Sequence, residues 1–144
     1  MNDKNTLIKI LAITGSLMVW FDVLLPFVFC VGTFIGDRVF RFDYVLPAEI
    51  FPVPFIGGLL LWWAALRVRS NHRIIGWGLL GGVVALVGGQ AIAVISGLAS
   101  GAIPPEGGPW MIVMASLFLF ILAFIVVGVG GIRLLRFLFG RRSS

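Results

Sequence analysis

Charged residues are scarce in this chain of 144 residues, and that scarcity excludes most soluble folds. Only 12% of the residues are charged, 60% are apolar, and the mean hydropathy is +1.10. A soluble domain of this size needs a charged outer shell to stay dispersed in water. The composition therefore predicts an integral membrane protein, in which lipid replaces water around most of the surface.

Cysteine and histidine are almost absent as well. The single cysteine, Cys30, cannot form an intrachain disulfide, and we interpret it as an apolar residue in or near the bilayer. The single histidine, His72, has no cysteine or carboxylate nearby in the sequence, so we predict no metal site and no cofactor. The G-x-G-x-x-G match that begins at Gly76 lacks the preceding strand and the acidic residue that dinucleotide binding requires.

The usual arrangements for nucleophilic catalysis are missing too. Ser16, Ser96 and Ser116 lie in or at the ends of apolar runs, and the outer side offers no histidine that could activate a hydroxyl group. We therefore predict no catalytic residue and interpret the chain as a non-enzyme. The alternative is a lipid-modifying enzyme that would use Asp37, Arg38, Arg41 and Asp43, the one polar cluster of the outer side.

Four apolar runs are present, and each suits a membrane-spanning helix, because about 20 residues at 1.5 Å per residue cross a hydrocarbon core of roughly 30 Å. The sequence predicts helices over residues 7–29, 48–66, 74–99 and 110–132, with a basic cytoplasmic tail over residues 133–144. Between the first two helices, Phe40, Phe42 and Tyr44 alternate with Arg41 and Asp43, which predicts a β-hairpin in the outer loop. We therefore expect an all-α four-transmembrane-helix bundle that forms a single domain.

The basic residues predict the orientation. Nine of the 11 Lys and Arg residues fall at one end of the expected bundle, and only Arg38 and Arg41 fall at the other. Because positive charge stays in the cytoplasm, both termini should be cytoplasmic in the plasma membrane of a bacterium. The basic residues lie at the ends of apolar runs rather than on a polar face, so we predict no nucleic-acid partner. The arginines expected to meet lipid headgroups are Arg67, Arg69, Arg73, Arg133, Arg136, Arg141 and Arg142.

Small residues recur along one face of the expected third helix. In lipid, helices associate where small side chains let their backbones come close. We therefore expect residues 74–99 to form the central packing helix, with contacts inside the bundle favoured and self-association of the chain as the alternative. The residues of this stripe are Gly78, Gly82, Ala85, Gly89, Ala93 and Ser96.

Asp22 is an acidic residue deep inside an apolar run. A carboxylate there costs a few kcal/mol on insertion scales, so it should face protein or water. Pro26 follows four residues later and cannot donate a hydrogen bond to the carbonyl of Asp22. Gln90 is the only amide deep in an expected span, and helix rise places it at about the same depth as Asp22. We hypothesise that Asp22 and Gln90 form an intramembrane polar pair that joins the first helix to the third.

Two functional classes follow from these residues. The polar residues of the spans are too few to line a path, so a non-catalytic accessory or interaction subunit, with the bilayer and other membrane subunits or a second copy as partners, is favoured. The alternative is a small oligomeric transporter or channel in which several copies of Asp22 and Gln90 surround a pore. The direction in which Asp22 points, toward helices of its own chain or toward a symmetry axis, distinguishes the two.

Overall fold

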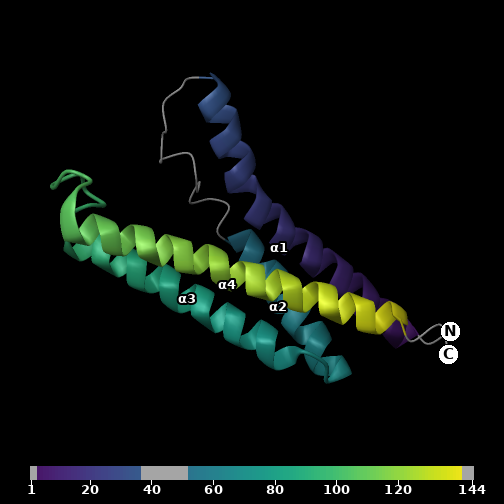
Figure 1. The fold of residues 1–144 in the computed structure, drawn as a ribbon. Helices are drawn as coiled ribbons and strands as arrows, with labels where there is room; N and C mark the ends of the chain where they lie inside the picture. Colours follow the sequence, from purple (N-terminus) through teal and green to yellow (C-terminus); the bar gives the residue numbers. More distant parts are fainter. Residues whose placement is uncertain (1–2, 37–51, 141–144) are drawn as a thin grey trace.

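The structure is a computed structural model that describes residues 3–36 and 52–140, and most of these residues are helical (Figure 1). The helices are α1 (Asp3–Gly36), α2 (Pro52–Val68), α3 (His72–Ile95) and α4 (Gly107–Gly140). No strand occurs in these two ranges. The expected β-hairpin falls within residues 37–51, which lie outside the described residues.

Three of these helices are long and apolar enough to cross a membrane. The spans are Asp3–Phe29 within α1, His72–Ile95 and Gly107–Gly140. The fourth helix, α2, is apolar but has only 17 residues, which corresponds to about 26 Å. The prediction of an all-helical membrane protein is confirmed for the described residues by the lengths and composition of its helices.

The helix ends differ from the predicted ones. α1 continues past residue 29 to Gly36, and α3 ends at Ile95 rather than at residue 99. Residues 133–140, expected to begin the basic tail, instead continue α4 to Gly140. They do so because Leu134 is buried and Leu138 is half-buried, while Arg133 and Arg136 point outward, so this segment still has an apolar helical face. The predicted start of the second helix at residue 48 is outside the described residues.

Helices that follow one another in the chain run antiparallel. The first turns of α1 lie beside the last turns of α4, where the Lys9 ammonium is 5.1 Å from the centre of the Phe139 ring. Figure 1 shows α3 and α4 as a long hairpin, with the start of α1 and the end of α4 close together at the opposite end from its turn. The first and last helices therefore place both termini of the described chain at the same end of the molecule.

α4, and not the helix over residues 74–99, is the centre of packing. α2 and α4 each pack against all three other helices, whereas α3 packs mainly against α4 and α2. Three glycines of α4 explain this, because each lets a different helix come close. Gly128 lies against Trp20 of α1, Gly130 against Ile75 of α3 and Gly131 against Leu61 of α2.

The core is built from buried residues of all four helices. Leu61, Ile75, Val127 and Leu134 are fully buried in it, and three aromatic rings extend the core toward the other end of α4. The Phe124 ring meets the Phe55 ring edge-on, with ring centres 5.2 Å apart and an interplanar angle of 88°. Edge-to-face contacts of this kind are favourable for aromatic pairs, so this cluster fixes the first turns of α2 against α4.

The far end of α1 leaves the bundle. In Figure 1 this helix leans away from α3 and α4 after its midpoint. The buried positions of α1 end at Pro26, and the apolar residues Phe27, Val28 and Val31 beyond it are exposed. Ile35, near the end of the helix, is 76% exposed. The side chains of Phe27, Val28, Val31 and Ile35 therefore present an exposed apolar surface on this part of α1.

Candidate functional site: a buried carboxylate between three helices

Asp22 lies on the buried face of α1. Only 6% of its surface is exposed. The buried positions of α1 recur every three or four residues, so they share one face, and this face packs against α2 and α4. The buried residues of the face are Ala12, Gly15, Ser16, Val19, Asp22, Val23 and Pro26. Asp22 therefore lies on the face of α1 that packs against other helices of its own chain.

The first turn of α2 lies at the level of Asp22. Val53 lines an apolar groove together with Trp20, Phe21 and Leu24 of α1, the residues that surround Asp22 in the sequence. A helix N-terminus carries free N–H groups and the positive end of the helix dipole, which favours a nearby carboxylate. Pro52 and Pro54 lack N–H groups, so this N-terminus has fewer donors to satisfy than an ordinary one.

Among the described residues, the side-chain hydrogen bonds of Ser96, Ser100 and Ser116 go to backbone carbonyls, and none reaches the Asp22 carboxylate. Pro26, one turn further along α1, is itself buried and leaves the carbonyl of Asp22 without its usual helical donor. Both polar groups are therefore placed together in the interior beside the start of α2.

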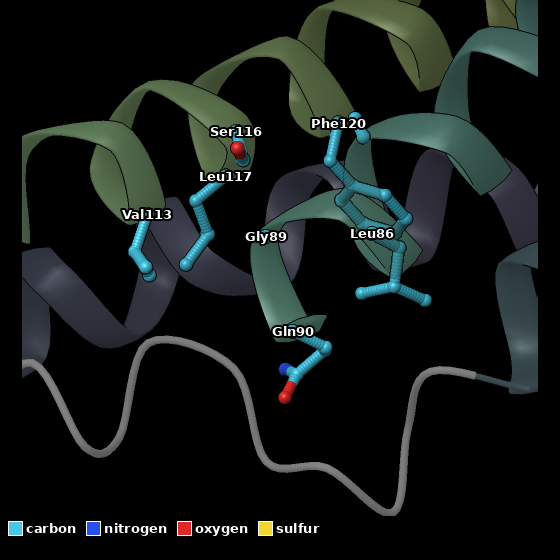
Figure 2. Close-up of a pocket in the computed structure, with 8 residues that line it drawn as sticks. Leu86, Gly89, Gln90, Val113, Ser116, Leu117 and Phe120 are labelled. Carbon is cyan, nitrogen blue, oxygen red and sulfur yellow. The ribbon is translucent and has the colours of Figure 1, made fainter. Parts of the chain in front are cut away.

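Gln90 lies elsewhere. It is exposed on α3, at the rim of a small cavity of about 40 Å³ between α3 and α4 that also includes Gly89, Ser116 and Phe120. Figure 2 shows the Gln90 side chain pointing away from Ser116 and from α4. Because α1 packs against α2 and α4 rather than along α3, the structure does not bring Asp22 and Gln90 together as a hydrogen-bonded pair.

The small residues of α3 divide into those that meet α4 and those that do not. A Cβ atom added at Gly78 would be 2.7 Å from Val127 Cγ2, and one at Gly89 would be 2.9 Å from the Cβ of Ser116. Gly82 lies equally close to the Phe124 ring. Ala85 and Ala93 are half-buried, and Ser96 follows the last helical residue, where its hydroxyl group donates to the carbonyl of Ala93.

Sequence reasoning missed a second close approach, between α1 and α2. A Cβ atom added at Gly15 would be 2.6 Å from the carbonyl oxygen of Gly57, so the two backbones nearly touch. The only available signals were Gly15 in the first apolar run and the pair Gly57 and Gly58 in the second, and a glycine by itself does not reveal which helix it faces. This crossing sets the height at which Asp22 meets α2.

Two buried nitrogen atoms have no hydrogen-bond partner in the described part of the chain. They are Nε1 of Trp20, which packs on Gly128, and Nδ1 of His72 at the start of α3. His72 adjoins the turn after α2, where Arg69 and Asn71 adopt left-handed backbone angles with φ of 55°. No group of three His, Cys, Asp or Glu side chains that could hold a metal occurs within residues 3–36 and 52–140.

The basic residues gather at the end of the molecule that carries both termini. Arg67, Arg69, Arg73, Arg133 and Arg136 are all exposed there, while Arg141 and Arg142 lie outside the described residues. The arrangement suits contact with a negatively charged surface. Comparisons of the chain with protein families, with curated proteins and with solved structures find no match.

Proposed function

We propose that this chain is a four-span protein of the bacterial plasma membrane with both termini in the cytoplasm. The three long apolar helices support a membrane location, and α2 is the element that returns the chain from the far end of α1 to the start of α3. The excess of Lys and Arg at the end that carries both termini supports the orientation. In this arrangement α2 is the shortest span, slightly shorter than the hydrocarbon core, which bilayers accommodate by local thinning.

Within that membrane, the chain acts as a non-catalytic accessory or interaction subunit. The position of Asp22 on the buried face of α1, the face that packs against α2 and α4, is the observation that carries this proposal, because a pore-lining carboxylate would face water or a symmetry axis. Gln90, the second residue that a pore would need, lies on a different helix face and points away from α4. The exposed apolar end of α1 offers contact surface to lipid or to another membrane subunit.

The experiment that tests this proposal compares the wild-type protein with Asp22→Asn and, as a matched control, Gln90→Ala. Purified proteins are reconstituted into liposomes, and proton and potassium flux is measured beside the mass of the particle in nanodiscs by light scattering. We expect flux at the level of empty liposomes for all three proteins, and a free energy of unfolding for Asp22→Asn within about 1 kcal/mol of wild type.

The transporter or channel alternative predicts the opposite result, a flux above that of empty liposomes. A defined oligomer whose wild-type flux exceeds that of empty liposomes and disappears in Asp22→Asn, with assembly unchanged, would overturn the accessory role. It would place the carboxylate on an ion path rather than at a helix junction.

A further inference from the structure

An open groove runs between the first turns of α1 and the last turns of α2. It has a volume of about 440 Å³ and is lined by Lys4, Leu7, Ile8, Leu11, Trp63 and Arg67. Its two walls come from helices that cross deeper in the molecule at Gly15 and Gly57, so the groove widens toward the end that carries the termini. The groove lies away from Asp22 and was not identified from the sequence.

Polarity changes in the same direction along both walls. On α1, Lys4 lies at the end of the helix, and Leu7, Ile8 and Leu11 follow over the next two turns toward the middle of the span. On α2, Arg67 lies in the last turn, and Trp63 one turn deeper. The groove is therefore cationic at its mouth and apolar below, over a depth of about 10 Å. This is the polarity of a phospholipid, with an anionic phosphate above two acyl chains.

The charge around the mouth is almost entirely positive. Within the described residues, Asp3 is the only acidic residue at this end of the molecule, against seven Lys and Arg residues. The described residues form no ion pair with Lys4 or Arg67, so neither cation is neutralised within the described part of the chain. An anionic ligand would supply a countercharge to both cations.

Arg67 is held in position by an aromatic ring. Its guanidinium carbon lies 5.4 Å from the centre of a ring of Trp63, within the range of a cation–π contact. A guanidinium group has N–H groups that match two oxygen atoms of a phosphate. The contact with Trp63 restricts the Arg67 side chain in advance of binding, which reduces the entropy lost when a ligand arrives.

We propose that this groove is a binding site for one anionic glycerophospholipid, with its phosphate between Lys4 and Arg67 and an acyl chain along Leu7, Ile8 and Leu11. The apolar floor selects a lipid rather than a free phosphate ester, because a soluble headgroup would leave that floor exposed. The proposal requires the chain to lie in a bilayer but does not depend on its accessory role. Basic pockets between transmembrane helices are suited to such headgroups.

The test is a titration of the full-length protein in neutral detergent with dioleoyl phosphatidylglycerol, with bound lipid counted by native mass spectrometry. Dioleoyl phosphatidylcholine and glycerol 3-phosphate are the neutral-lipid and soluble-headgroup probes. We expect one phosphatidylglycerol to bind most tightly, phosphatidylcholine to bind at least tenfold more weakly, and glycerol 3-phosphate not to compete. Lys4→Gln and Arg67→Gln should each weaken binding about fivefold, and the double variant about 25-fold.

Lys9→Gln is the matched control, because Lys9 is a basic residue of the same helix end that lies over Phe139 instead of lining the groove. Its affinity for phosphatidylglycerol should equal that of wild type. Arg67→Lys keeps the charge but loses the planar guanidinium group, and it should bind two- to threefold more weakly. Equal losses in Lys9→Gln and Arg67→Gln would overturn the site, as would no loss in the double variant. Competition by glycerol 3-phosphate would show that the groove binds a soluble anion and not a lipid.

Discussion

Trp20 shows how one side chain of α1 is fitted to one glycine of α4. A Cβ atom added at Gly128 would lie 3.0 Å from both Cε2 and Nε1 of the indole. The indole N–H is buried there without a hydrogen-bond partner among the described residues. The ring is therefore held by shape rather than by its polar atom, and its contribution to stability should survive the loss of the N–H group.

Replacing Trp20 tests this interpretation. Trp20→Phe should lower the free energy of unfolding by no more than about 1 kcal/mol, because it removes an unsatisfied donor along with some contact area. Gly128→Ala should destabilise the wild-type protein and cost less in the Trp20→Phe background, since the smaller ring leaves room for the methyl group. The measurement is thermal unfolding in detergent for the four proteins of this cycle. Strictly additive effects would mean that the two residues do not share a contact.

At the scale of the helices, glycine decides which faces meet. Gly78 and Gly81 are three residues apart on α3 and both face Ala123 of α4, but only at Gly78 would an added Cβ atom come within 3.1 Å of the carbonyl oxygen of that residue. The nearest atom to a Cβ at Gly81 is the Ala123 side chain at 3.8 Å, an ordinary van der Waals distance. The close packing of α3 on α4 therefore depends on particular glycines and not on the glycine content of the helix.

We expect Gly78→Val to destabilise the protein by about 2–3 kcal/mol, because a backbone carbonyl cannot move aside as a side chain can. Gly81→Val, the matched control on the same helix, should stay within about 1 kcal/mol of wild type. The free energy of unfolding of both variants is measured by titration with sodium dodecyl sulfate, which follows the loss of helicity and of the folded state. Equal destabilisation by the two substitutions would show that helix propensity, rather than the contact with α4, is responsible.

The whole molecule is a hairpin of α3 and α4 joined to a crossed pair of α1 and α2. Its helices bring both ends of the chain to one end of the bundle, and the turn around Ser100 to the other. In the proposed topology these two ends face opposite sides of the membrane. The number of helices that cross the membrane, and whether α2 is one of them, can therefore be tested by measuring from which side of the membrane single positions are accessible.

Single cysteines test that topology. In a Cys30→Ala background, Ser100→Cys should react with a membrane-impermeant maleimide in intact spheroplasts, and Ser144→Cys should react only after the membrane is permeabilised. Ser100 is exposed in the α3–α4 turn, so poor access within the fold would not explain a failure to label. Labelling of Ser144→Cys in intact spheroplasts would contradict the cytoplasmic C-terminus. Labelling of both positions from the same side would mean that α4 does not cross the bilayer.

The sequence alone was enough to predict a helical membrane protein with long apolar spans, and the clustering of Lys and Arg beside the chain ends. Hydropathy and charge are local properties, because each segment partitions between lipid and water according to its own residues, whichever segments pack beside it. The sequence could not show that Asp22 faces α2 and α4, that α4 is the centre of packing, or that Lys4 and Arg67 line one groove. Those features depend on which segments cross and at what height, and glycines of two different helices, such as Gly15 and Gly57, set that height together. Depth counted along the chain put Asp22 level with Gln90, but helix rotation and packing order, which only the tertiary structure decides, separated them.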